Sequence, residues 1–183
     1  MNKQILVLAT VLILMLTACN RDFTYVEANQ RNGYKFDDEK MVVETQFILE
    51  LQSASMLMQE LSTEVNDKAY SVEAKEYTKA ALKQYKLLSV KIDILAVKEG
   101  IRLTETMKPE HLEIYYQVRK QEKKNLDRVY LEEVTHLQSG LLKKMKDLST
   151  SAKDDNVRSF IAENSGMVEE YLDRSIKAQN ELI

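Results

Sequence analysis

The chain has 183 residues, and its 26 lysines and arginines against 29 aspartates and glutamates give a formal net charge of −3. Hydrophobic residues make up 44% of the chain, which is enough for a folded core and excludes a wholly disordered protein. With 4 glycines and 1 proline, the chain lacks the turn residues of a β-sandwich or doubly wound fold, so its composition predicts helices. The slightly acidic balance gives no electrostatic footprint for nucleic acid.

The first residues resemble a bacterial export signal. Lys3 precedes an apolar run over residues 5–16, which is shorter than the roughly 20 residues of a membrane span. The run ends in Leu16-Thr17-Ala18-Cys19, which resembles a lipobox, where cleavage falls before a cysteine whose thiol carries diacylglycerol. We therefore expect residues 1–18 to be a lipoprotein signal peptide. Cys19 is the expected lipidation site, holding acyl chains such as palmitate.

The residue after that cysteine bears on location. In the enterobacterial sorting rule an aspartate there retains a lipoprotein in the inner membrane, so Asn20 favours the outer membrane of the cell envelope. Residues 19–37 are polar and aperiodic, which predicts a tether between the membrane and a folded domain.

Residues 38–183 show four stripes of apolar residues at helical spacing. The first runs from Phe47 to Val65, with Asp37 and Asp38 as candidate caps, and the second from Ala74 to Leu95, between a Ser71 cap and Gly100. The third begins at Pro109 and continues to Leu148, and the fourth runs from Val157 to Leu182 after a cap at Asp154-Asp155.

Short connections between these stripes predict that each helix runs antiparallel to the next. The expected fold is therefore an all-α, antiparallel four-helix bundle over residues 38–183. A long dimeric coiled coil is the alternative, although the helix stops near residues 67, 100 and 150 favour chain reversals.

Four-helix bundles often hold two metal ions through carboxylates and Glu-x-x-His pairs. The only such pair here is Glu133 and His136, and His136 lies at the margin of its helix's apolar face. We expect no metal or other cofactor, with Glu133 and His136 as the alternative ligands. The sequence contains no nucleophile elbow, phosphate loop or dinucleotide fingerprint, so we expect no enzyme activity.

Tyrosines on the apolar stripes are the most distinctive feature of the expected core. Simple packing, with each hydroxyl reaching the surface or one partner, is the first interpretation. The second is a buried polar network in the middle of the bundle, because an unpaired buried hydroxyl costs about 1–3 kcal/mol. Its candidate members are Tyr85, Gln138, Asn164 and Tyr171.

Three short segments resemble the DUF4142 family of bacterial envelope proteins. Leu126-Asp127-Arg128-Val129-Tyr130 is similar to the family's Phe-Asp-x-x-Tyr motif, and Ala96–Leu103 is similar to its Ala-x-x-x-Gly-Ile/Val-x-Leu turn. Phe47 and the pair Ala54-Ser55 stand where the family's first helix has Phe and Gly-Gly. The resemblance spans about residues 40–180 and implies a ferritin-like four-helix bundle. The family's glutamate and three histidines align with Met58, Tyr85, Gln138 and Tyr171, which implies that any metal site of the family is lost in this chain.

These observations predict a membrane-anchored lipoprotein of the cell envelope whose helical bundle binds or supports other components without catalysis. One alternative is a ferritin-like metal-binding or redox and stress protein, and another is an oligomerising helical spacer. The expected partners are the membrane, through the N-terminal lipid, and an envelope protein, with no role for nucleic acid. The oligomeric state stays open.

Overall fold

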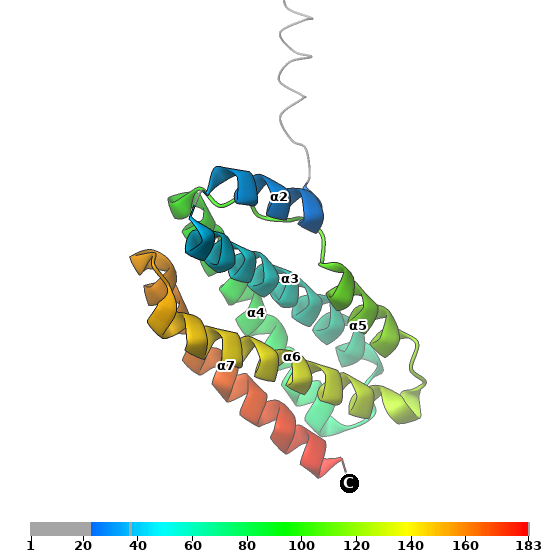
Figure 1. Cartoon of the computed structure of the whole chain (residues 1–183). Helices are drawn as coiled ribbons and strands as arrows, with labels where there is room; N and C mark the ends of the chain where they lie inside the picture. The colour runs from blue at the N-terminus through cyan, green and yellow to red at the C-terminus, as the bar shows by residue number, and fades with distance from the viewer. Residues whose placement is uncertain (1–22, 37, 183) are drawn as a thin grey trace, which may run out of the picture.

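The computed structural model describes residues 23–36 and 38–182, which form six α-helices and no strand (Figure 1). The helices are α2 (Tyr25–Lys35), α3 (Glu39–Lys68), α4 (Val72–Glu99), α5 (Pro109–Arg119), α6 (Lys123–Ser151) and α7 (Asp155–Glu181). The predicted all-α fold is confirmed for this part of the chain. The predicted signal peptide, Cys19 and Asn20 lie outside the described residues.

The helix ends follow the chemistry of the sequence. The side chains of Asp38, Ser71 and Asp154 accept hydrogen bonds from backbone N–H groups in the first turns of α3, α4 and α7. Gly100 ends α4 with a φ of 63°, in the left-handed region that glycine adopts without a Cβ clash. A side chain at Gly100 would also clash with the Lys35 ammonium group, which lies too close to the position of its Cβ.

The four long helices α3, α4, α6 and α7 enclose the apolar core. α3 packs against α4 and α6, while α7 packs against α6 and α4. Stripe residues of all four helices are buried, among them Leu51, Met58, Leu88, Val134 and Ile161. Each fully buried aliphatic side chain stabilises the fold by about 1.5–3 kcal/mol, so these stripes supply most of the driving force for folding.

The region after Pro109 differs from the prediction of one helix up to Leu148. It forms α5 and α6, separated by residues 120–122, and α5 packs beside α3 and α6. The charged side chains of Arg119, Glu122 and Lys123 interrupt the apolar seam there. A helix continuing through them would carry charge into the core, which is costly.

Because α5 takes an extra length of chain back along the molecule, α4 and α6 run in the same direction. Asp127 near the start of α6 accepts hydrogen bonds from the backbone of Tyr70 and Ser71, which directly precede α4. The prediction that each long helix runs antiparallel to the next was therefore wrong at this step.

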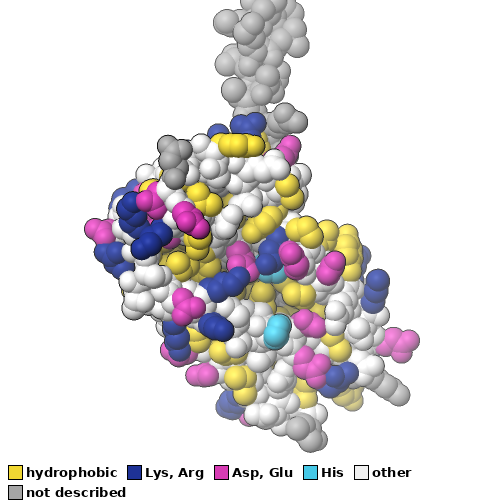
Figure 2. Space-filling view, viewed as in Figure 1, with side chains coloured by type: hydrophobic (Ala, Val, Ile, Leu, Met, Phe, Trp, Pro, Cys, Tyr) yellow, Lys and Arg dark blue, Asp and Glu magenta, His cyan; other side chains and the backbone are white. Residues whose placement is uncertain are grey.

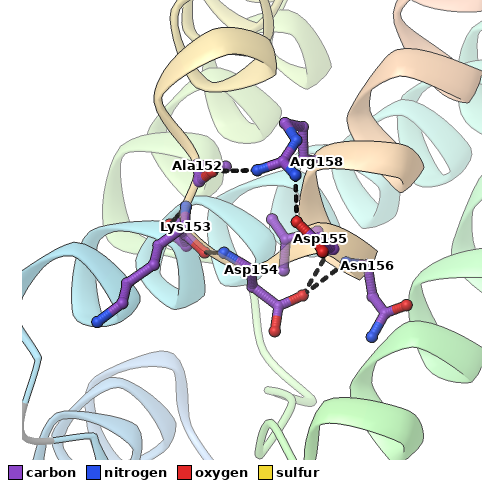
Figure 3. Close-up of polar contacts among 8 residues, drawn as sticks. Ala152, Lys153, Asp154, Asp155, Asn156 and Arg158 are labelled. Atoms are coloured by element: carbon purple, nitrogen blue, oxygen red, sulfur yellow. Dashed lines mark hydrogen bonds and ion pairs between the residues drawn. The ribbon is translucent and has the colours of Figure 1, made fainter.

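Buried carboxylates hold both chain reversals between long helices. Asp127 accepts from the backbone nitrogens of Tyr70 (3.1 Å) and Ser71 (2.6 Å) between α3 and α4. Glu44 accepts from those of Lys153 and Asp154 (3.2 Å) between α6 and α7. Figure 3 shows this second turn, in which Arg158 also donates to the carbonyl oxygen of Ala152. These bonds satisfy backbone donors that the helices leave unpaired.

Residues 23–35, which we expected to belong to a tether over 19–37, are a folded part of the domain. α2 lies across one end of the long helices (Figure 1). The Asn32 side chain is buried, donates to the carbonyl oxygen of Arg102 and accepts from its N–H, both at 2.8 Å. Lys35 donates to the carbonyl oxygen of Gly100 at 2.6 Å, and the carbonyl oxygen of Phe23 accepts from the Glu105 N–H at 2.9 Å. The tether prediction was wrong over these residues.

Asn32→Ala removes both bonds to Arg102 and should loosen α2. A loss of about 1–3 kcal/mol for a buried polar pair corresponds to roughly 5- to 160-fold faster hydrogen exchange of the backbone amides in α2. Exchange measured by mass spectrometry should show this increase, whereas Gln30→Ala, an exposed change in the same helix, should leave the rates unchanged. Equal rates in the two variants would contradict the docking of α2 through Asn32.

Candidate functional site

The middle of the core contains an amide that three helices share. Gln138 of α6 is fully buried, and one orientation of its side chain satisfies both ends. The amide nitrogen then donates to the carbonyl oxygens of Val134 and Tyr171, both at 3.2 Å. The amide oxygen accepts from the hydroxyls of Tyr77 (2.9 Å) and Tyr85 (3.1 Å) on α4.

Four aromatic rings lie in contact with one another in this part of the core, and we call Tyr77, Tyr85, Tyr130 and Tyr171 the tyrosine cluster. The Tyr77 ring lies 6.0 Å from Tyr130 and 6.3 Å from Tyr171, and Tyr85 lies 6.5 Å from Tyr171, in tilted or edge-on geometry. The hydroxyls of Tyr130 and Ser62 are 3.1 Å apart and hydrogen-bonded. Burial raises the pKa of Tyr77, Tyr85 and Tyr130, so these phenols stay neutral at physiological pH.

The predicted network residues have different fates. Tyr85 and Gln138 are hydrogen-bonded to each other. Tyr171 contributes its ring and its carbonyl oxygen, but its hydroxyl donates to the carbonyl oxygen of Ala80 at 3.2 Å and accepts from Arg174. Asn164 lies outside the cluster, because its nitrogen donates to the Phe160 carbonyl oxygen and its oxygen accepts from Lys91. Seven residues separate it from Tyr171, about 10 Å along α7.

Sequence reasoning left Tyr77 and Tyr130 out of the network, although both lay on the apolar stripes. Their spacing relative to Tyr85 and Gln138 could have included them, since Tyr77 is two helical turns before Tyr85 and Tyr130 is two turns before Gln138. The sequence did not indicate that Ser62 bonds to Tyr130, because a small serine among apolar residues of a helix is typical of ordinary packing.

The centre does not fit the metal group of a ferritin-like bundle. Such sites use carboxylate and imidazole ligands facing inward, whereas the side chains here are protonated phenols and an amide that bond to one another. Glu133 accepts from Gln117 at 2.8 Å, and the His136 side chain is exposed to solvent. Within residues 23–36 and 38–182, no three His, Cys, Asp or Glu side chains are grouped to hold an ion.

A second polar cluster lies where α5 begins. The Ser53 hydroxyl accepts from the backbone N–H of Lys108 at 2.7 Å and pairs with Nδ1 of His111 at 2.8 Å. Because that oxygen receives the Lys108 proton, its own hydrogen is free to point at the ring nitrogen. Ser53 and His111 are both buried, so a substrate has no access to this pair. The pair holds α5 against α3.

Charged side chains beside this pair form ion pairs with one another. Glu50 accepts from Lys108 at 2.9 Å and also pairs with Lys144. Burial alone would raise the pKa of Glu50, but hydrogen bonds from these two lysines hold it below its usual value. Burial lowers the pKa of His111 to about 4, and the positive charge of Lys108 acts in the same direction.

The family is decided by comparison with known proteins. A family model described as "Domain of unknown function (DUF4142)" matches residues 35–177, more than three quarters of the chain. The chain belongs to the DUF4142 family. No curated protein and no solved structure matches this DUF4142 protein. The segment similar to the family's Phe-Asp-x-x-Tyr motif has a structural role here, since Asp127 holds the turn before α4 and Tyr130 belongs to the tyrosine cluster.

Changes in the tyrosine cluster should destabilise the protein in a definite order. Gln138→Met leaves two buried hydroxyls without their acceptor and should cost about 2–4 kcal/mol, whereas Tyr85→Phe removes one bond and should cost about 1 kcal/mol. Tyr171→Phe should cost less than Tyr85→Phe, because its hydroxyl bonds beside the charged Arg174 near the surface. Urea unfolding of the three variants measures these costs, and a smaller loss for Gln138→Met than for Tyr171→Phe would contradict the network.

His111 should make stability depend on pH. The folded protein keeps the ring neutral down to about pH 4, while the unfolded chain protonates it below about 6.5. The unfolded state thus binds more protons in this window, so the stability present above pH 6.5 falls as the pH falls towards 4, by on the order of 3 kcal/mol at most.

His111→Asn provides the matched comparison, because an amide oxygen can accept from Ser53 but does not titrate. Between pH 7 and 4.5 the variant should lose about 1–3 kcal/mol less of its free energy of unfolding than the wild type. Parallel pH profiles for the two proteins in urea unfolding would show that His111 is not held neutral in the fold.

Proposed function

We propose that this DUF4142 protein is a lipoprotein of the bacterial cell envelope, anchored through Cys19, whose helical domain acts without catalysis in a binding or structural role. The observation that carries the proposal is the segment Leu16-Thr17-Ala18-Cys19 directly after a short apolar run. None of the helices in the described part of the chain is long and apolar enough to span a membrane.

The proposed architecture of the domain is a ferritin-like, antiparallel four-helix bundle of α3, α4, α6 and α7. These helices have 27 to 30 residues each. Bonds such as Ser62 to Tyr130 and Lys91 to Asn164 pair the start of one helix with the end of its neighbour, which supports antiparallel contacts. The shared direction of α4 and α6 supports a ferritin-like connection, in which one long crossover joins two helical pairs.

Two features support a role without catalysis. The centre of the bundle is filled by neutral side chains that hydrogen-bond to one another, and burial raises the pKa of its phenols, so these phenols stay protonated and do not act as bases. The Ser53–His111 pair, which has the residue types of a nucleophile and its base, is sealed inside the domain.

The proposed location is the outer membrane, on the strength of Asn20, and the proposed partners are the membrane and an envelope protein. On the face in Figure 2, cations and carboxylates are interspersed without a continuous basic patch. Nucleic-acid binding uses a clustered basic patch, so this mixture of charges supports a partner other than nucleic acid.

Lipidation can be tested in a bacterial host that expresses the full chain with an alkyne analogue of palmitate. We expect the wild type to carry the label, to begin at Cys19 by intact mass and to sediment with membranes. Cys19→Ala should lose all three properties, because no thiol is left to accept diacylglycerol. Ala18→Gly keeps a small residue before the cysteine and should behave as the wild type.

A wild-type chain without acyl groups would contradict the lipoprotein proposal. Iron or manganese at one or two ions per chain in the same purified protein would contradict the role without a metal and favour the ferritin-like alternative.

A further inference from the structure

The outer face of α4 exposes four large apolar side chains in a row. Leu87, Val90, Ile94 and Val97 are spaced three, four and three residues apart, so they share one side of the helix. Their exposed fractions rise along the chain from 50% through 56% and 65% to 85%. We call these four residues the α4 stripe. A contiguous apolar surface of this kind on a folded domain marks a contact with something else.

The stripe occupies only the second half of the outer face of α4. Between Val72 at the start of the helix and the stripe, the positions on the same face are the exposed, charged residues Glu76, Lys79 and Lys83. The apolar surface therefore begins midway along the helix and continues for about 15 Å to its C-terminal end.

That end of α4 and the first described residue, Phe23, lie on one side of the domain and share a cavity. Phe23, Val97, Gly100 and Arg102 line one cavity, and the Arg102 guanidinium stacks 4.9 Å from the centre of the Phe23 ring. Four residue steps separate Cys19 from Phe23, which an extended chain covers in at most about 14 Å. A lipid on Cys19 thus keeps the most exposed end of the stripe close to the membrane surface.

We propose that the α4 stripe rests on the lipid bilayer that holds Cys19, so that the C-terminal half of α4 contacts the membrane. This inference depends on the lipid anchor of the proposed function. α2 is docked to the loop after α4, so only the four residue steps from Cys19 to Phe23 separate the lipid from the folded domain. That length is too short to hold the domain away from the membrane. The stripe then buries apolar surface at the acyl boundary and adds to the affinity of the anchor.

Charged side chains flank the stripe on both sides. Lys91 and Lys98 lie along its α7 side, hydrogen-bonded to Asn164 (2.8 Å) and Asn156 (2.6 Å). Lys86 and Asp93 lie along the other side. Glu163 lines a cavity with Ile94, and Glu105 lines one with Val97, so the flanking charges are mixed. Lysines at the edge of an apolar surface can reach lipid phosphates while their stems lie on that surface.

The test uses the full-length lipidated protein in vesicles of phosphatidylethanolamine with a minority of phosphatidylglycerol. Ile94→Cys supplies the only free thiol, because the Cys19 thiol is consumed by its thioether, and it is labelled with an environment-sensitive fluorophore. Val72→Cys is the matched control, since Val72 is exposed on the same helix and lies about 33 Å away along it. We expect nitroxide-labelled lipids to quench the label at position 94 about threefold more than the label at position 72.

A second substitution separates contact from mere proximity. Val90→Glu places a charge in the stripe at an exposed position, where it should not affect folding, and should abolish the lipid quenching of the label at position 94. Val72→Glu adds the same charge outside the stripe and should leave that quenching unchanged.

Each outcome has one meaning when the intact mass of Cys19 is measured on the same sample. An unacylated protein contradicts the proposed function, and this inference with it. An acylated protein whose two labels are quenched equally overturns this inference alone. A label at position 94 that is shielded from aqueous iodide but unaffected by lipid nitroxides also overturns it, because a protein or a second copy then covers the stripe.

Discussion

Backbone N–H groups at the turns of a helical protein need acceptors, and here side chains from other helices supply them. An N–H left buried without a partner costs about 1–3 kcal/mol. Asp127, Glu44 and Asn32 each meet this requirement for a turn far away in the sequence. The same bonds therefore satisfy the backbone and fix where each pair of helices lies.

The two carboxylates act reciprocally. Asp127, on α6, holds the turn between α3 and α4, while Glu44, on α3, holds the turn between α6 and α7. Each helical pair thus contributes an acidic side chain to the turn of the other pair. Loss of either carboxylate would free one turn and weaken the packing of both pairs, which gives Asp127 a structural reason to stand in the segment that resembles the family's motif.

The long helices could be predicted because their evidence is local. Apolar spacing and caps such as Asp38, Ser71 and Gly100 all lie within a few residues of the feature they determine. α2 was missed because Asn32 docks it to Arg102, 70 residues away, and no periodicity reports such a bond. A local sign did exist, since Thr24 and Glu27 form a capping box at its start.

Only part of the polar centre could be predicted, because some of its contacts depend on how the helices pack. Tyr85 and Gln138 lie on buried stripes, so their meeting required only that α4 and α6 face each other. Asn164 lies apart from the amide because of where α7 sits along its neighbouring helices. The sequence of α7 alone does not determine that position.

The shared amide has a consequence for the alignment of the helices. The side-chain amide of Gln138 on α6 forms hydrogen bonds with two hydroxyls of α4 and with one backbone carbonyl of α7. Sliding α6 by one turn, about 5.4 Å, would bring apolar Val134 or Leu141 against two phenols that have no other acceptor. Purely apolar helices tolerate such slippage, because their side chains are interchangeable. In this protein a single glutamine therefore specifies the register of three helices, in the way that one buried asparagine specifies the register of a coiled coil.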